Sequence, residues 1–436
     1  MSYLHTARDT GHPTLTELPN NTWRSLLRIG MLTHYFDPEG GAAATPGVIA
    51  RSLHHRGHSV DVVTGYPNYP EGTIFDGYSF KLFYHEKIDG IDVHRLPMYP
   101  SHDARAVHRI ANFMSFGLSS LAGAPRLLRP VDVQFVYFSP ATTTLGALPL
   151  ALSKKVPMVM LIQDMWPDSV TSSGFLPDRT TRLVNGILNP FCNFLYKTAA
   201  SIAVTSPSMA DLLIERGVDA TKIHFVPNWS DESAFHPTER NQALREELGI
   251  TGRFTMMYAG NLGDMQNLDT AIEAAELLRH RPDIQFVFVG SGIKESHLRD
   301  MATSRGLTNI VFVPPQPFDR MSEIIALADC QLVSLRDSRI MRSTLPSKLQ
   351  ANLAAGSPII GAVAGDAASV IDAAGCGMVA TPGNAESLAH AIEKMATLDP
   401  VELGALAQNA RAYYENTFSE QVACDRLVDV LTQAVV

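Results

Sequence analysis

The sequence predicts an α/β protein built from two doubly wound, Rossmann-like parallel sheets. Short apolar runs alternate with helical patterns along the chain, which is typical of βαβ units. Glycine-rich turns follow several of these runs, as they do where a parallel strand passes into a helix. The length of 436 residues exceeds what one hydrophobic core usually holds, so we expect two domains.

The composition is that of a globular protein without a broad nucleic-acid surface. Hydrophobic residues make up 45% of the chain and charged residues 18%, and the net charge of −9 argues against a nucleic-acid partner. The first 25 residues are polar and carry no secretion signal, and we find no run of 18 uncharged apolar residues. We therefore expect a cytoplasmic chain. The four cysteines lack C-x-x-C spacing, so we expect them reduced and mostly buried, without zinc. They are Cys192, Cys330, Cys376 and Cys424.

The N-terminal half opens with a βαβ pattern around a glycine pair. An apolar run at 27–33 leads to Gly40-Gly41, a predicted helix at 45–56 and a second strand at 60–64. The pattern G-x-G-x-x-G is absent there, which weakens a nicotinamide-cofactor interpretation. Paired glycines let a backbone approach a ligand closely, although they can also serve only as a turn.

Further strands are predicted at 131–138, 158–163, 202–205 and 223–226, and Asp89-Gly90 predicts a hairpin. Ligands gather at the carboxyl ends of parallel strands, so four loops should meet at one rim. These loops are 37–41, 66–69, 139–140 and 163–168. In the last loop, Asp164 could orient or deprotonate a hydroxyl and Trp166 could stack on a sugar. Alternatively, Asp164 caps a helix and Trp166 packs in the core.

Residues 105–121 predict an amphipathic helix. Its apolar side is rich in Phe and Met, and its other side carries Arg105, His108, Arg109 and Asn112. The pattern suits a helix on a membrane surface, and equally a core-facing helix with a solvated basic side.

The C-terminal half repeats the alternation after a polar, proline-containing stretch at 227–240, where we place the linker. Strands are predicted at 254–259, 284–289, 310–313, 331–335 and 358–361. We therefore expect a polar extension at 1–26, a first Rossmann-like domain at 27–230, a second Rossmann-like domain at 231–405, and closing helices at 406–436 that pack back toward the first domain. Two such domains leave one cleft between them, which is the default ligand site.

Residues 342–361 carry the strongest site signal. Pro346 fits only a first helical turn, so a helix should begin at Ser347-Lys348 and end before Gly356. Ser343 and Thr344 are predicted to accept from free backbone N–H groups. Lys348 with Arg336 and Arg342 would suit an anion at this helix start. An ordinary capped helix with a solvated lysine is the alternative.

The sequence resembles the family 4 retaining glycosyltransferases of the GT-B fold. The resemblance rests on Gly260-Asn261-Leu262, Val289-Gly290-Ser291-Gly292, Leu345-Pro346-Ser347-Lys348-Leu349 and Gly375-Cys376-Gly377, in the family's order. The stretches HYFDPEGGAAA, GHSVDVVTGYPNYPEG and IQDMWPDS resemble the subgroup that builds cell-surface polysaccharides, including colanic-acid-type and O-antigen fucosamine transferases. The resemblance covers residues 27 to 433.

The resemblance implies transfer of a sugar from a nucleotide diphosphate to a hydroxyl acceptor, a lipid-linked glycan at the inner membrane face. It makes 27–230 the acceptor-side domain and 231–405 the nucleotide-sugar-binding domain. Lys348 and Arg342 would neutralise the leaving diphosphate, and Asp164 would position the acceptor. The other donor-binding residues would be Gly40, Gly41, Gly260, Asn261, Gly290, Arg336 and Ser347. Tyr66, Asn68 and Trp166 would join Asp164 in acceptor binding. No Asp-x-Asp sequence is present, so we expect no metal and no cofactor beyond the donor substrate. Residues 105–121 would contact the inner membrane peripherally.

Two positions depart from the family pattern. Many members carry a pair of glutamates eight positions apart, where this chain has Ser343 and Ala351. The second glutamate ordinarily holds the donor ribose, which Ala351 cannot do. A nucleotide-sugar-binding homologue with weak or no activity is therefore an alternative. A nucleotide-sugar epimerase that uses His34, His102 and Asp164 is another.

Overall fold

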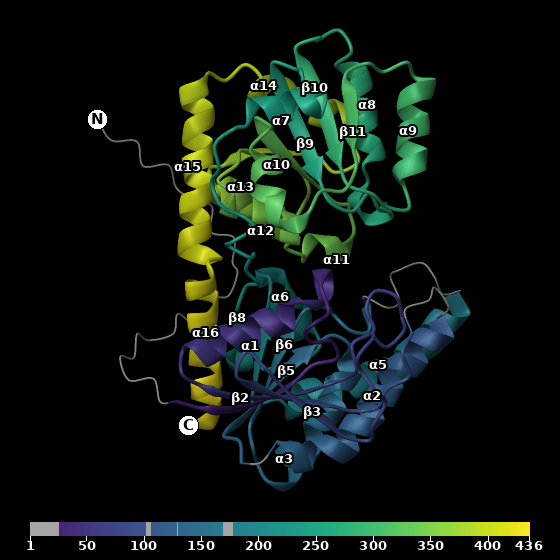
Figure 1. The fold of residues 1–436 in the computed structure, drawn as a ribbon, viewed down its shortest axis with the longest axis vertical. Coiled ribbons are helices and arrows are strands. Elements are labelled where there is room, and N and C mark those ends of the chain that lie inside the picture. Colours follow the sequence, from purple (N-terminus) through teal and green to yellow (C-terminus); the bar gives the residue numbers. More distant parts are fainter. Residues whose placement is uncertain (1–25, 102–105, 129, 169–177) are drawn as a thin grey trace.

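A computed structural model describes residues 26–101, 106–128, 130–168 and 178–436. The chain forms two halves, with the N-terminal half in purple to teal below the C-terminal half in green (Figure 1). Each half contains one sheet covered by helices, so the predicted two-sheet α/β architecture is confirmed. His102, Arg105 and residues 1–25 lie outside the described residues.

The N-terminal sheet has eight strands in the order β3-β4-β2-β1-β5-β6-β7-β8. Its strands are β1 (Arg28–Leu32), β2 (Ser59–Thr64), β3 (Tyr84–Ile88), β4 (Ile91–Arg95), β5 (Val133–Phe138), β6 (Met158–Ile162), β7 (Ser201–Val204) and β8 (Ile223–Phe225). All neighbours run parallel except β3 and β4, which form the predicted hairpin. Its turn needs two positive φ angles, which Asp89 (49°) and Gly90 (84°) provide.

The C-terminal sheet has six parallel strands in the order β11-β10-β9-β12-β13-β14. These are β9 (Phe254–Ala259), β10 (Ile284–Val289), β11 (Ile310–Val313), β12 (Cys330–Ser334), β13 (Ile359–Ala362) and β14 (Gly377–Ala380). No helix or strand lies between β8 and residue 242, and the stretch 227–240, where we place the linker, falls within this segment.

Helices connect the strands on both sides of each sheet. In the N-terminal half they are α1 (Thr45–His55), α2 (Ala106–Leu127), α3 (Leu148–Ser153), α5 (Asp178–Thr198) and α6 (Pro207–Glu215). In the C-terminal half they are α7 (Gln242–Glu247), α8 (Asp269–Leu277), α9 (Glu295–Ser304), α10 (Met321–Ile325), α11 (Arg339–Arg342), α12 (Ser347–Ala354), α13 (Asp366–Ala374), α14 (Ala385–Met395), α15 (Pro400–Thr417) and α16 (Glu420–Val435).

Both faces of the N-terminal sheet are buried. Met31 and Val62 belong to one apolar cluster, whereas the next residues along each strand, Leu32 and Val63, belong to another. The last two helices link the halves: α15 packs in the C-terminal half through Tyr414, and α16 packs against the N-terminal sheet (Figure 1). All four cysteines are buried and free, as predicted.

Strand order fixes where ligands can bind. In the N-terminal sheet, β1 has β2 on one side and β5 on the other, so the loops after β1 and β5 diverge. In the C-terminal sheet, β9 lies between β10 and β12 in the same way. Ligands are expected where such loops diverge. In the N-terminal half this position holds residues 34–41, which follow β1, and in the C-terminal half it holds Gly260, after β9, and Arg336, after β12.

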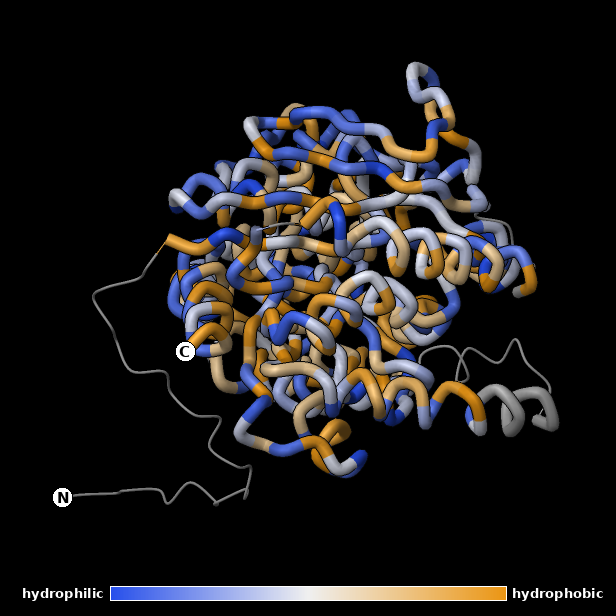
Figure 2. Tube along the Cα trace, turned by 90° about the horizontal axis from the view of Figure 1, so that it is seen from below, coloured by the Kyte–Doolittle hydropathy of each residue, from blue (hydrophilic) through white to orange (hydrophobic). Residues whose placement is uncertain are grey.

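Helix α2 does not bury its apolar side as the core-facing interpretation requires. Five apolar residues at helical spacing are exposed by 38% to 73%, so that interpretation is wrong for them. They are Val107, Ile110, Met114, Leu118 and Leu121. Conversely Asn112, expected on the solvated side, is buried and bonds His34 Nε2 through Oδ1 at 2.8 Å. Seen from below, apolar stretches reach the outer edge of the molecule at several places (Figure 2).

Candidate active site

The amine of Lys348 lies beside Tyr258 and Gly260 in the C-terminal half. Lys348 is in the first turn of α12, and its Nζ lies 5.0 Å from the centroid of the Tyr258 ring. A Cβ at Gly260 would lie 2.5 Å from this Nζ, and the φ of Gly260 is +136°, so only glycine fits beside the amine. Burial lowers the pKa of Lys348 to about 8. No ion pair involves Lys348 among the described residues, and burial leaves its charge poorly solvated.

The start of α12 is open to a ligand. Pro346 precedes the helix, and no side chain among the described residues caps its first turn. The capping expected of Ser343 and Thr344 is wrong, because both hydroxyls donate to α11 carbonyls instead. Thr344 Oγ1 lies 2.8 Å from the carbonyl oxygen of Ile340, and Ser343 Oγ lies 3.2 Å from it. The free N–H groups of α12 and the exposed Ser347 therefore remain available beside Lys348.

The two arginines near this helix already have acidic neighbours. Arg342 forms a bidentate ion pair with Asp337, with distances of 2.7 and 2.8 Å, and the pair raises the pKa of Arg342. The guanidinium of Arg336 is exposed and lies 3.9 Å from Asp264. Among these three cations, only Lys348 lacks a carboxylate partner in the described part of the chain.

Glycines line the same crevice. Gly290 follows β10 with a φ of +133°, and a Cβ there would collide with the carbonyl of Gly260. Asn261 follows Gly260, and its carbonyl accepts the Tyr258 hydroxyl at 2.8 Å. In the N-terminal half, Gly40 and Gly41 are exposed, and no atom lies within 4 Å of a Cβ built on either. The Gly40-Gly41 turn therefore leaves space for a ligand against its backbone.

Two buried charged residues that sequence reasoning missed hold the Gly40-Gly41 turn. The Glu39 carboxylate is 2% exposed and accepts from the N–H groups of Phe36, Asn68 and Tyr69 at 3.0, 2.7 and 2.8 Å. Burial raises the pKa of Glu39, whereas the three N–H donors oppose that shift.

The second of these residues is Arg95, which is fully buried. Its guanidinium donates to the carbonyl of Asp37 and, at 3.0 Å, to that of Gly65. The adjacent glycine pair gave a local signal for a turn, but nothing in the sequence showed which distant residues would fix it.

Among the four residues predicted to bind the acceptor, only Asp164 has a side chain that is exposed and yet desolvated by surrounding protein atoms. Its side chain is exposed, yet surrounding protein atoms desolvate the carboxyl and raise the pKa of Asp164, against a 2.9 Å hydrogen bond from Ser139. Trp166 is half-buried and packs edge-on against Phe113, with 6.1 Å between ring centroids. Part of its ring is therefore committed to packing.

Tyr66 and Asn68 do not face the cleft. Tyr66 is 0% exposed and its hydroxyl bonds the backbone of Lys81, whereas Asn68 is 1% exposed and donates to the carbonyl of Tyr66 at 2.9 Å. Burial argues against acceptor contact by either side chain, and we leave both out of the proposed site.

The two halves touch through hydrogen bonds at the start of α6. Ser208 donates its N–H and its hydroxyl to Asp366, at 2.8 and 2.6 Å. The Ser206 hydroxyl donates to the carbonyl of Ser343 at 2.5 Å. Gln350 in α12 donates to the carbonyl of Asn228 at 3.0 Å. These contacts hold α12 close to the N-terminal half.

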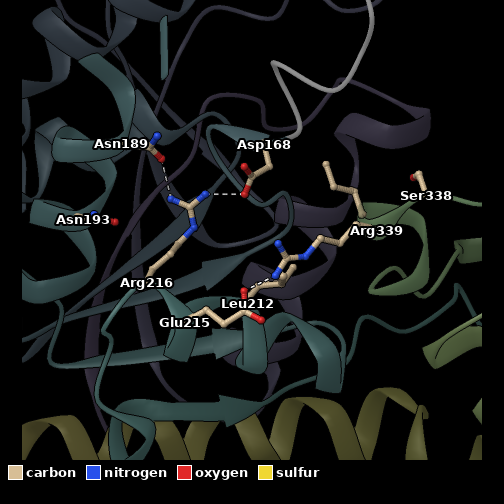
Figure 3. A pocket seen from close by; sticks show the side chains of 9 residues that line it. Asp168, Asn189, Asn193, Leu212, Glu215, Arg216, Ser338 and Arg339 are labelled. Carbon is tan, nitrogen blue, oxygen red and sulfur yellow. Dashed lines mark hydrogen bonds and ion pairs between the residues drawn. The ribbon is translucent and has the colours of Figure 1, made fainter. Parts of the chain in front are cut away.

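A cavity of about 560 Å³ lies beside these contacts, between α5, α6 and α11 (Figure 3). Arg216 projects into it and bonds Asn189 at 2.9 Å and Asp168 at 2.5 Å. Glu215 and Arg339 pair across the two halves at its edge. None of the described residues that line this cavity is one of the predicted site residues.

The described residues contain neither a cluster of metal-ligating side chains nor a membrane-spanning helix. No group of three or more His, Cys, Asp or Glu side chains is arranged to hold a metal ion there. Within the same residues, no helix is long and apolar enough to cross a membrane.

One parallel sheet and one sheet that is parallel except for its β3–β4 hairpin form the two-domain architecture of the GT-B fold. The chain belongs to the group 1 glycosyl transferases, family 4: residues 40–229 match the glycosyl transferase 4-like domain, and residues 240–413 match glycosyl transferases group 1. It is 30% identical over 331 residues to WcaI of Escherichia coli (strain K12), named as a colanic acid biosynthesis glycosyl transferase. That match covers 74% of this chain and 79% of WcaI.

Solved structures show the same fold. Sucrose-phosphate synthase from Thermosynechococcus elongatus superposes with a TM-score of 0.69 at 17% identity, covering 92% of this chain and 97% of that one. Anabaena HepE, solved with UDP and glucose, has a TM-score of 0.65 at 15% identity and covers 93% of this chain and 100% of its own. The predicted family and fold are thereby confirmed.

Proposed function

We propose that this glycosyltransferase is a retaining enzyme that moves a hexose from a nucleotide diphosphate to a lipid-linked glycan in cell-surface polysaccharide synthesis. The observation that carries the donor assignment is the desolvated Lys348 amine, beside Gly260 and at the uncapped start of α12. A leaving nucleoside diphosphate gains negative charge as the glycosidic bond breaks. An uncompensated cation and free N–H groups stabilise that charge more in the transition state than in the substrate.

The N-terminal half completes the proposed donor site. Figure 1 shows the turn before α1 on the side of its half that faces the C-terminal half. Gly40 and Gly41 leave their backbone N–H groups accessible to the diphosphate there, because no side chain fills the space around them. Gly290, Asn261, Ser347 and Arg336 surround the donor from the other half. Arg342 reaches it only by leaving Asp337.

Asp164 is the residue we propose for orienting the acceptor hydroxyl. Its desolvated carboxylate accepts a hydrogen bond from Ser139, and its side chain is exposed just after the carboxyl end of β6. Desolvation makes a carboxylate a better proton acceptor, which suits removal of the hydroxyl proton as the new bond forms. Trp166 is half-buried two residues further along the chain, and we propose that it stacks on the acceptor sugar.

The positive charge at the start of α12 accounts for the proposal that the transfer reaction needs no metal ion. Lys348 and the α12 N–H groups occupy the place where a divalent ion would otherwise neutralise the diphosphate. Similarity to WcaI supports a polysaccharide role, and similarity to HepE supports a nucleotide sugar as donor. The exposed apolar side of α2, together with the exposed Arg109, supports peripheral contact with the inner membrane face.

A thermal-shift screen of UDP, GDP and dTDP, with their sugars, tests the donor assignment. A bound nucleotide raises the melting temperature by mass action, and EDTA should leave the shift unchanged. Incubation with a radiolabelled donor and a lipid-linked acceptor pool then tests transfer. Binding without transfer would favour the inactive-homologue alternative, which the buried Ala351 in place of the ribose-binding carboxylate motivates. Binding of no nucleotide would refute the proposal.

A further inference from the structure

The segment Phe80-Lys81-Leu82-Phe83 presents three large apolar side chains to solvent. Phe80 is 63% exposed, Leu82 72% and Phe83 54%. The segment lies just before β3 and belongs to neither a helix nor a strand. Apolar side chains clustered on a protein surface in this way mark an interaction site.

Tyr66 holds this segment in its exposed conformation. The hydroxyl of Tyr66 accepts from the N–H of Lys81 at 2.9 Å and donates to its carbonyl at 3.0 Å. The ring of Phe80 stacks on the Tyr66 ring with 5.8 Å between centroids and 23° between planes. A buried side chain therefore fixes the backbone from below, so the exposure is built into the fold.

The same packing connects the segment to α2. Asn68, which donates to the carbonyl of Tyr66, also lies 3.8 Å from the sulfur of Met98. The next residue, Tyr99, donates its N–H to Ser115 in α2 at 2.8 Å, and its carbonyl accepts from Asn112 at 2.7 Å. A continuous set of contacts thus connects the segment to the first turns of α2. These contacts lie near the carboxyl ends of β2 and β4 and the cleft.

The charges around this layer suit an anionic partner. Lys81 and Arg109 are both exposed, and neither forms an ion pair within the described ranges. Lys81 lies between Phe80 and Leu82, so its long stem can follow them while its ammonium stays at a polar boundary. Aromatic and aliphatic side chains around an unpaired cation are typical of groups that enter the interface of a lipid bilayer.

We propose that Phe80–Phe83 inserts into the surface of an anionic membrane together with the exposed side of α2, and so turns the cleft toward the bilayer. The inference rests on the proposed function, because a lipid-linked acceptor must reach Asp164 from the membrane. It assigns Tyr66 a positioning role: Tyr66 holds the insertion segment.

The test uses the full chain and vesicles of equal parts phosphatidylcholine and phosphatidylglycerol in a flotation assay. The double variant Phe80→Ser, Leu82→Ser should bind these vesicles at least about 100-fold more weakly, because each of the two inserted apolar side chains contributes at least about tenfold. The matched control Leu277→Ser, Val401→Ser removes exposed apolar residues from the C-terminal half and should bind like the unmodified chain. High salt should weaken vesicle binding by the unmodified chain only in part, because salt screens the charges of Lys81 and Arg109 but does not affect the apolar contact.

Three results would overturn the inference: no flotation of the unmodified chain, unchanged flotation of the Phe80/Leu82 variant, or equal loss in the control. A dimer that the Phe80/Leu82 variant dissociates would assign the patch to a second copy of the chain and also overturn it. The nucleotide thermal shift, measured on the same samples, separates this outcome from failure of the donor site. A variant that no longer floats but keeps its shift has lost only membrane contact.

Discussion

The protonation of Lys348 makes nucleotide affinity depend on pH in a specific way. Burial lowers the pKa of its ammonium to about 8, and only the protonated form attracts a diphosphate. At this pKa about nine-tenths of the free protein carries the charge at pH 7 but only about 3% at pH 9.5. Affinity should therefore fall as pH rises through 8, by up to about 30-fold between these two values.

The ligand does not explain such a loss, since a terminal phosphate with a pKa near 6 is already about nine-tenths ionised at pH 7 and only gains charge as the pH rises. Isothermal titration of the nucleoside diphosphate selected by the thermal screen, at pH 7, 8, 9 and about 9.5, measures the effect. In Lys348→Met the affinity at pH 7 should be about 10- to 150-fold lower, the value of one charged hydrogen bond, and it should no longer change with pH.

Lys394→Met, which removes an exposed lysine at the end of α14, provides the matched control and should keep both the affinity and the pH dependence. A flat affinity in the unmodified protein over this range would refute the reasoning. Normal affinity in Lys348→Met would refute it as well.

Three further predictions concern the N-terminal half. In Glu39→Gln, one amide oxygen cannot accept hydrogen bonds from three N–H groups, so the Gly40-Gly41 turn should loosen. Nucleoside diphosphate should then bind about tenfold more weakly, while the affinity for nucleoside monophosphate stays the same. Equal weakening of both ligands in titrations would contradict this prediction. Burial lowers the pKa of His34 to about 4, so the free energy of unfolding should fall as the pH drops below about 6.5. The loss should reach about 2 kcal/mol at pH 5. Urea unfolding of His34→Gln should not show this loss. Asp164→Asn should reduce transfer at least about 100-fold with nucleotide binding kept, and normal transfer by it would exclude Asp164 as the acceptor base.

Strand positions were predictable because parallel strands buried on both faces are short continuous apolar runs. Phe254–Ala259 and Ile284–Val289 match β9 and β10 at both ends. β14 was missed, because its four residues Gly377–Ala380 are only partly buried and include a glycine. The start of α12 was predictable from Pro346, because proline is restricted to the first turn of a helix.

The support of the site was less predictable, since it depends on residues distant in the chain. No local pattern in the sequence singles out Glu39 or Arg95, yet both are buried by loops that only the sheet brings together. The exposed side of α2 was ambiguous for the same reason: periodicity identifies an apolar side but not what covers it. Tyr66 lies on the predicted rim, but its hydroxyl is used by Lys81.

A crystal structure with the selected nucleoside diphosphate is the most direct test of the account. We predict that the diphosphate oxygens lie within hydrogen-bonding distance of Lys348 Nζ and the first N–H groups of α12, with Gly40-Gly41 approaching from the other half. A diphosphate bound instead in the cavity between α5, α6 and α11, or with Lys348 turned away from it, would contradict the account.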